Sequence, residues 1–377
     1  MGTITRNFAN NIVTGGKVDG TDGLTGTIPA SNVANDTLTN LTAFPATVGD
    51  FVEVTASDVP ASPSTVGQLF YNSTSGTLKG IRNLGAAWSS APNANTARTS
   101  GVGAGTQTAA LWAAGNEPPN STATEEYDGS SWTAGGSMSL ARRALGGTGT
   151  QTAGLIATGY YGDTGGPPSG SNATEEYNGT SWTNGGNVNT TRYATGLGGT
   201  QTAGLATGGN VGSVSPGNYN EEYNGSSWTN TGSFPQGLRG VSSLAGTQTA
   251  MLWAGGATAS DSVRRDTVVE YDGSTWTTTT SLPGTRVSLG MSGTQTSALI
   301  AYGNSPAVPG PGSYTSAFIF NGTSWTATGN TANTGGAVGF ANQGTTTASL
   351  ATGTGSPAIQ TEEFVDPTIA AQTLTTS

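Results

Sequence analysis

An internal repeat sets the strongest limit on how this chain can fold. The string Gly-Thr-Gln-Thr begins at Gly105, Gly149, Gly199, Gly246 and Gly293, and a degenerate Gly-Thr-Thr-Thr begins at Gly344. Successive copies are therefore 44, 50, 47, 47 and 51 residues apart. A period in this range indicates an array of similar units, each of which buries its apolar surface against its neighbours.

A second marker runs in phase with the first. A string of Tyr or Phe, Asp or Asn, Gly and two hydroxyl residues ends at Trp132, Trp182, Trp228, Trp276 and Trp325, and Trp88 stands alone before them. Each tryptophan precedes the glycine of the next Gly-Thr-[Gln/Thr]-Thr string by 17 to 19 residues. Six units in register are therefore expected.

The pattern within a unit is that of β-strands. An apolar run such as residues 109–113 ends at a glycine and is followed by a polar loop of variable length. A Thr-Glu-Glu-Tyr segment and an Asn-Gly or Asp-Gly pair come next, and such a pair is a strong hairpin signal. Four short strands in each unit, with no helical period, predict an all-β six-bladed β-propeller.

The order of residues within a unit resembles a kelch repeat. An arginine follows the tryptophan by 10 or 11 residues, at Arg98, Arg142, Arg192, Arg239 and Arg286, and an apolar strand ending in glycine comes after it. The sixth unit has Gly335 in place of this arginine and Phe364 in place of the tyrosine. The resemblance covers residues 84–377 and implies that the repeated Trp, Tyr and Arg residues are structural, bridging strands or blades.

Ring closure has two candidates, because the sixth unit lacks a strand after its Thr-Glu-Glu-Phe segment. One candidate is the strand around Trp88, which would join the two ends of the propeller. The other is the C-terminal segment 372–375. The preserved spacing between Trp88 and Gly105 favours the first.

Composition excludes many kinds of chemistry. The chain has no Cys and no His, so disulfides, thiol nucleophiles, Cys/His zinc sites and Ser-His-Asp triads are impossible. The same absence excludes the copper chemistry of galactose oxidase, another kelch-type propeller. A net charge of −10 with two lysines offers no basic footprint for nucleic acid. No apolar run is long enough to span a membrane, and no secretory signal is recognisable. We expect no catalytic residue, metal or cofactor.

Paired glutamates recur at one place in four units, at Glu125-Glu126, Glu175-Glu176, Glu221-Glu222 and Glu362-Glu363. Adjacent strand residues point to opposite faces, so a pair is not one acid/base couple. We interpret the pairs as solvated or turn-capping, with a calcium-binding ring as the alternative. The registered arginines could suggest a sialidase, but a sialidase site gathers dissimilar residues from different blades.

The N-terminal residues 1–65 differ from the repeats. They are rich in Thr, Asn, Gly and Val, and they have too little apolar surface for a monomeric core of their own. Residues 21–33 resemble shaft and attachment segments of bacteriophage tail fibres, and residues 67–80 resemble a hairpin of marine-phage tail proteins. We therefore expect an attachment or oligomerisation segment over 1–65, a connecting hairpin over 66–83 and the propeller over 84–377.

The variable loops are the candidate binding surface, because a rigid scaffold commonly carries binding residues on its loops. Their large or cationic side chains are Tyr160, Tyr161, Tyr219, Arg264, Arg265 and Tyr314. Trp112 and Trp253 are expected to fill the core rather than to stack on sugars.

These features together predict a non-enzymatic virion protein, made in the host cytoplasm and released by lysis. It would be a tail fibre or appendage that attaches to other virion proteins through its N-terminal segment and binds a host glycan or receptor. A homotrimer is one assembly that we consider. A capsid, neck or tail adaptor is the alternative, and a glycan-cleaving tailspike the third reading.

Overall fold

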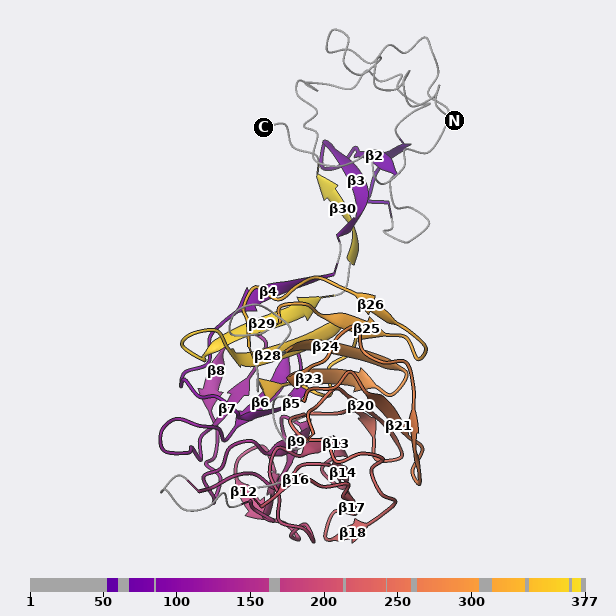
Figure 1. Cartoon of the computed structure of the whole chain (residues 1–377). Coiled ribbons are helices and arrows are strands. Elements are labelled where there is room, and N and C mark those ends of the chain that lie inside the picture. The colour runs from indigo at the N-terminus through magenta and orange to yellow at the C-terminus, as the bar shows by residue number, and fades with distance from the viewer. Residues whose placement is uncertain are drawn as a thin grey trace. The chain divides into compact units, whose positions relative to one another are not determined.

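The computed structural model describes residues 53–59, 68–84, 86–162, 170–212, 215–241, 243–258, 263–304, 314–335, 339–365 and 368–373. The chain forms two compact units, Met1–Gly85 with Pro367–Ser377 and Ala86–Asp366 (Figure 1). All regular secondary structure in the described residues is β-strand.

The larger unit contains six four-stranded antiparallel sheets. Blade 1 consists of β5(Val102–Thr106), β6(Ala109–Ala113), β7(Thr124–Tyr127) and β8(Trp132–Ala134). Blade 2 consists of β9(Gly146–Thr150), β10(Ala153–Ala157), β11(Thr174–Tyr177) and β12(Trp182–Asn184). Blade 3 consists of β13(Gly196–Thr200), β14(Ala203–Thr207), β17(Asn220–Tyr223) and β18(Trp228–Asn230). Blade 4 consists of β19(Ala245–Thr247), β20(Ala250–Ala254), β21(Val268–Tyr271) and β22(Trp276–Thr278). Blade 5 consists of β23(Val287–Thr294), β24(Ser297–Asn304), β25(Phe318–Phe320) and β26(Trp325–Ala327). Blade 6 consists of β27(Gly339–Phe340), β28(Ala348–Thr354), β29(Gln360–Val365) and β4(Ala87–Ala91). Outside the blades, β15(Asn210–Val211) and β16(Ser215–Pro216) form a small hairpin.

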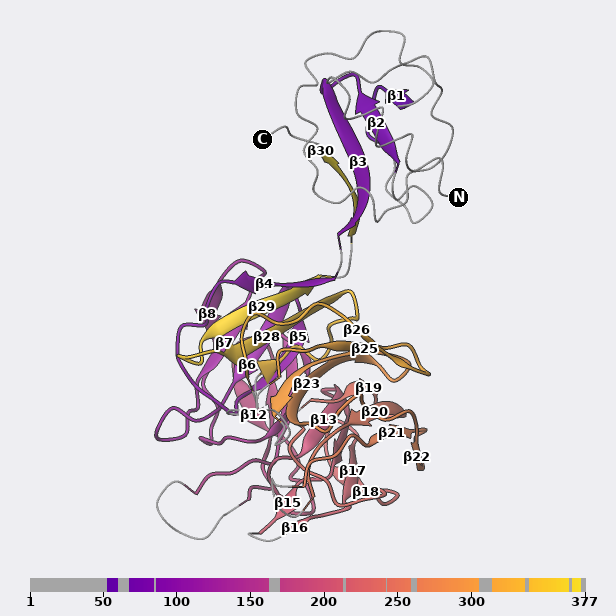
Figure 2. The same cartoon turned by 45° about the horizontal axis from the view of Figure 1, so that its top comes forward.

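The blades form a closed ring. The innermost strands β5, β9, β13, β19, β23 and β27 contact one another in sequence, and β27 contacts β5. The ring is joined by strand β4, which pairs antiparallel with β29 and places Trp88 opposite Phe364. Strands β4, β29 and β28 lie side by side in both views (Figures 1 and 2). The six-bladed all-β prediction is confirmed, and of the two candidates for closure it is the Trp88 strand that completes blade 6.

Burial falls from the axis of the propeller to its rim. The second strand of blades 1 to 4 is buried at all but its first residue, whereas the outer strand buries at most its tryptophan. Strands packed on both faces carry continuous apolar runs, which explains segments such as Ala109–Ala113. Trp112 and Trp253 are fully buried, as expected for core residues.

The Gly-Thr-Gln-Thr string is the turn between the first two strands of a blade. Gly199 has φ +100°, and a Cβ there would lie 2.2 Å from the Ala203 carbonyl oxygen. The glutamine that follows reaches the preceding blade: Gln201 Nε2 donates to the carbonyls of Gly154 (3.1 Å) and Tyr177 (2.7 Å). Equivalent pairs of bonds come from Gln151, Gln248 and Gln295.

The axis of the ring is bridged by polar side chains. Asn342 Nδ2 donates to the Gly147 carbonyl at 3.2 Å, and Gln343 Nε2 donates to the Gly199 carbonyl at 2.9 Å. Blade 6 is thereby tied to blades 2 and 3. The inner-strand glycines also let neighbouring blades pack closely, since a Cβ on Gly147 of blade 2 would lie 2.4 Å from a methyl of Val102 of blade 1.

The smaller unit contains one described sheet, in the order β1(Glu53–Thr55), β2(Leu69–Asn72), β3(Thr77–Leu84) and β30(Thr368–Thr373). Strand β30 pairs with β3 and not with blade 6, so the propeller ends at Asp366 and not at the expected residue 377.

Most of the expected attachment segment 1–65 lies outside the described residues. No helix in the described part of the chain is long and apolar enough to cross a membrane.

Candidate functional site

The candidate binding surface is one end of the propeller. The connections between the second and third strands of the blades pair there with the segments that lead from one blade into the next, through bridges such as Thr99 with Asn116, Arg143 with Tyr160 and Arg239 with Ala257. We call this end the loop face. Because backbone bridges hold both kinds of connection, the loops start from fixed positions on a rigid ring.

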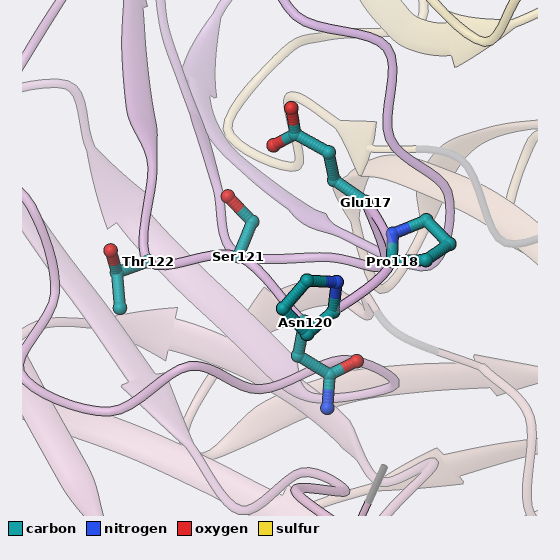
Figure 3. A pocket seen from close by; sticks show the side chains of 6 residues that line it. Glu117, Pro118, Asn120, Ser121 and Thr122 are labelled. Carbon is teal, nitrogen blue, oxygen red and sulfur yellow. The ribbon is translucent and has the colours of Figure 1, made fainter.

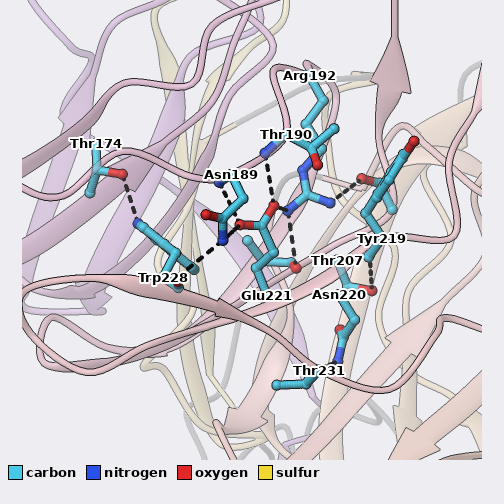
Figure 4. A network of polar contacts seen from close by, with 12 residues as sticks. Thr174, Asn189, Thr190, Arg192, Thr207, Tyr219, Asn220, Glu221, Trp228 and Thr231 are labelled. Atoms are coloured by element: carbon cyan, nitrogen blue, oxygen red, sulfur yellow. Dashed lines mark hydrogen bonds and ion pairs between the residues drawn. The ribbon is translucent and has the colours of Figure 1, made fainter.

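Buried ion pairs lie beneath the loop face in blades 1 to 3. Arg192 Nη2 contacts Glu221 Oε1 at 2.9 Å, and both side chains are fully buried (Figure 4). The other Glu221 oxygen accepts bonds from the backbone NH (2.6 Å) and side-chain amide (2.9 Å) of Asn189. Burial lowers the pKa of Arg192 to about 10. Arg98 with Glu125 (3.1 Å) and Arg142 with Glu175 (2.7 Å) repeat the pair.

The first glutamate of each pair is therefore not solvated, which corrects that part of our interpretation. The turn-capping part holds, since Glu221 accepts bonds from the backbone NH groups of Asn189 and Thr190. A glutamate and an arginine that are distant in sequence meet because the blade folds both toward the same point. A buried charge is tolerated when it is paired and hydrogen-bonded, and Glu221 meets both conditions. In blade 6, which lacks the arginine, Glu362 instead accepts bonds from Tyr302 (2.5 Å) and from the backbone NH of Ala332 (2.7 Å).

The second glutamate of each pair joins neighbouring blades. Tyr177 donates to Glu126, and Tyr271 Oη donates to Glu222 Oε1 at 2.8 Å. Burial, together with the bond to a carboxylate, raises the pKa of Tyr177 to about 12. The tryptophans also cross between blades, since Trp228 Nε1 donates to Thr174 Oγ1 at 2.9 Å. In each of blades 1 to 4 the Tyr and Trp rings pack within the blade, with centroids 4.9 to 5.0 Å apart.

One predicted loop residue, Tyr160, belongs to a cluster of aromatic and cationic side chains on the loop face. The Arg143 guanidinium lies 4.7 Å from the centroid of the Tyr160 ring, and the Tyr193 ring meets Tyr160 edge to face at 5.5 Å. Asn120 joins them by donating to the Tyr160 carbonyl at 3.3 Å. We call these four residues the Tyr160 cluster; all except Asn120 are partly exposed.

Sequence reasoning missed Arg143 and Tyr193. Each stands directly after a registered arginine, Arg142 or Arg192, and adjacent residues of an extended segment point to opposite sides. When the arginine turns into the blade, the next side chain is left on the loop face. This alternation was the available signal.

An open pocket of about 370 Å³ lies beside this cluster and is lined by Glu117 to Thr122 of the blade 1 loop (Figure 3). Asn120 belongs to both, because its Oδ1 accepts a bond from Arg143 Nη1 at 3.4 Å. The Glu117 carboxylate is exposed. The pocket therefore adds carboxylate, amide and hydroxyl groups to the edge of an aromatic surface.

The other predicted loop residues belong to the loops of blades 2 to 5. Tyr161 is 48% exposed, and Tyr219 is 38% exposed with its ring 5.7 Å from the Arg192 guanidinium. Arg264, Arg265 and Tyr314 belong to the loops of blades 4 and 5. Among the described residues no group of three acidic side chains could hold a metal ion, so the calcium-ring alternative has no geometry there.

The chain matches no protein-family model and no curated protein sequence. A solved structure entitled "Structure of YjhT" is similar, with a TM-score of 0.60 and 14% sequence identity, over 75% of this chain and 99% of that one. Identity this low shows the fold alone. The class that the fold defines is that of the six-bladed β-propellers.

Proposed function

We propose that the protein is a phage virion appendage that acts by binding, with a kelch-like propeller whose loop face contacts a glycan on the host cell surface. The observation that carries this proposal is the Tyr160 cluster, in which aromatic rings and a guanidinium are presented on a rigid ring. Aromatic faces and planar hydrogen-bonding groups are the usual elements of a pre-organised binding surface.

The partners of the repeated glutamates support binding rather than catalysis. Glutamates 125, 175 and 221 are engaged by buried arginines, and glutamates 126, 176 and 222 accept bonds from tyrosines of the next blade. A glycosidase needs two carboxyl groups free to exchange protons on either side of one bond. The paired glutamates are poorly suited to that role.

Binding to intact bacteria tests the proposal. Fluorescently labelled full-length protein should bind saturably to cells of a host strain, and extracted surface polysaccharide should compete. Tyr160→Ala should weaken this binding about tenfold, the cost of losing a central aromatic contact. Thr229→Ala, at an exposed position of outer strand β18, is the matched control and should bind like the native protein.

Two results would count against the proposal. If the native protein binds no strain of a panel, yet is incorporated into virions, an adaptor role replaces receptor binding. If reducing sugar is released from the polysaccharide, the protein is a glycan-cleaving tailspike.

A further inference from the structure

The registered arginine does not face a glutamate in blades 4 and 5. In blades 1 to 3 the registered arginine faces a glutamate on the third strand. The residue at that strand position is Val269 in blade 4 and Phe318 in blade 5, as the pairings of β21 with β22 and of β25 with β26 show. Arg286 therefore has no carboxylate partner among the described residues, although it is 2% exposed.

Neutral groups surround the Arg286 guanidinium instead. Its Nη1 donates to the carbonyls of Tyr302 (3.1 Å) and Ser316 (2.7 Å), and its Nη2 donates to Ser316 Oγ at 2.6 Å. The ring of Tyr314 lies 4.3 Å away. Burial lowers the pKa of Arg286 to about 10. The positive charge is solvated by dipoles and a π face but is not neutralised.

A second arginine stands beside it. Arg265 pairs with Arg286 in an antiparallel bridge, and residues opposed in such a bridge project to the same side. The equivalent positions in blades 1 and 2, identified by the same backbone bond to the glycine that ends the second strand, are Ser121 and Ser171. Arg265 is partly exposed and forms no ion pair with a described carboxylate; the neighbouring Asp266 is exposed and pairs with neither arginine.

Two departures from the repeat thus coincide, one removing a carboxylate and the other adding a guanidinium. Places where a chain departs from its own structural rules are commonly functional. We propose that Arg265, with Arg286 behind it and Tyr314 beside it, binds the acidic group of an anionic polysaccharide. The planar fork of arginine fits the two oxygens of a carboxylate or sulfate group.

This inference deepens the proposed function, because it gives the host glycan an acidic character. Diffuse attraction cannot supply such binding in a chain of net charge −10. Affinity for a polyanion must therefore come from a local site.

The test measures binding of the full-length protein to immobilised polygalacturonate, dextran sulfate and neutral dextran. We expect binding to one or both acidic polymers and not to dextran, and the polymer bound identifies the acidic group. Arg265→Gln should weaken it about tenfold, the loss expected for a charged hydrogen bond, and Arg265→Lys should weaken it less. Lys79→Gln, which removes one positive charge from an ion pair with Asp58 in the other unit, is the control and should not change it. Unchanged thermal unfolding of Arg265→Gln would show that the fold is intact.

The inference is overturned if the native protein binds dextran as well as the acidic polymers, or neither kind. It is equally overturned if Arg265→Gln has no effect or if Lys79→Gln causes the same loss. The two proposals can fail separately. If the protein binds cells but not acidic polymers, the receptor role stands and the anion site is wrong. If it binds acidic polymers but not cells, the anion site stands and the receptor role is wrong.

Discussion

At the scale of single residues, blades 1 to 3 of the propeller each contain a buried arginine paired with a buried glutamate. Glu221, for example, is 0% exposed. It forms an ion pair with Arg192 and accepts hydrogen bonds from the backbone NH and the side-chain amide of Asn189. Breaking such a pair by removing one partner typically costs about 3–5 kcal/mol, because the other charge remains buried. Although only 9% of residues in this chain are charged, six of them form these buried pairs.

The inter-blade tyrosines predict a loss of stability in alkali. Burial and a glutamate partner raise the pKa of Tyr177 and of Tyr223 to about 12, while the pKa of an unfolded tyrosine is about 10. This stabilisation is complete below pH 10 and is lost as the pH rises from 10 to 12, because the unfolded chain releases its protons first. The free energy of unfolding, measured by urea titration from pH 9 to 11.5, should fall across this window.

A double variant isolates the two side chains. Tyr177→Phe/Tyr223→Phe should be less stable at pH 8 but should lose less stability between pH 10 and 12 than the native protein. Parallel pH profiles for the two proteins would refute this account.

At the scale of elements, the hairpin between the first two strands links each blade to the one before it. Gln248 Nε2 donates to the carbonyls of Gly204 (3.0 Å) and Tyr223 (2.7 Å), so one turn side chain satisfies two backbone groups of the neighbouring sheet. The preceding glycine sets the direction of that side chain through its positive φ. This explains why the glycine and the glutamine recur together.

We expect Gly199→Ala to destabilise the protein by more than about 2 kcal/mol, through a left-handed backbone and a collision with the Ala203 carbonyl. Gly212→Ala separates the two causes, because Gly212 has φ +63° but no atom within 4 Å of the position that a Cβ would occupy. It should cost about 1 kcal/mol, the backbone contribution alone. Thermal unfolding of both variants provides the comparison, and equal losses would contradict the steric explanation.

At the scale of the whole molecule, the sequence of the propeller interrupts the sequence of the smaller unit. The chain enters the ring through β4 and leaves it through β29, and these strands pair with each other. Strands β3 and β30, the next elements on either side, also pair. The ring is therefore closed by the two ends of its own sequence.

Closure by β4 predicts a sharp difference between two truncations. A protein of residues 86–366 retains β4 and should unfold cooperatively, whereas one of residues 92–366 loses the buried Trp88 and its contacts with Tyr302, Phe340 and Phe364. Loss of a buried tryptophan alone costs about 3–5 kcal/mol, which corresponds to roughly 10 °C in unfolding midpoint. Equal midpoints in calorimetry would show that β4 is dispensable for closure.

Local patterns repeated at a fixed period were enough to predict the blade count, the strand order and the closing strand. The residue types at Gly199 and at the Asn-Gly turns report backbone geometry within a few residues, and such geometry can be read locally. Tyr160 was also recognised as a candidate, since it is a large side chain in a variable loop.

Which side chains meet became known only from the folded chain. The burial of Glu221 on Arg192, the contact of Arg143 and Tyr193 with Tyr160, and the pairing of Arg265 with Arg286 all join residues from different loops or blades. The pairing of β30 with β3 rather than with blade 6 is of the same kind. Such contacts depend on which distant segments the fold brings together, and the local pattern of the chain does not specify those pairings.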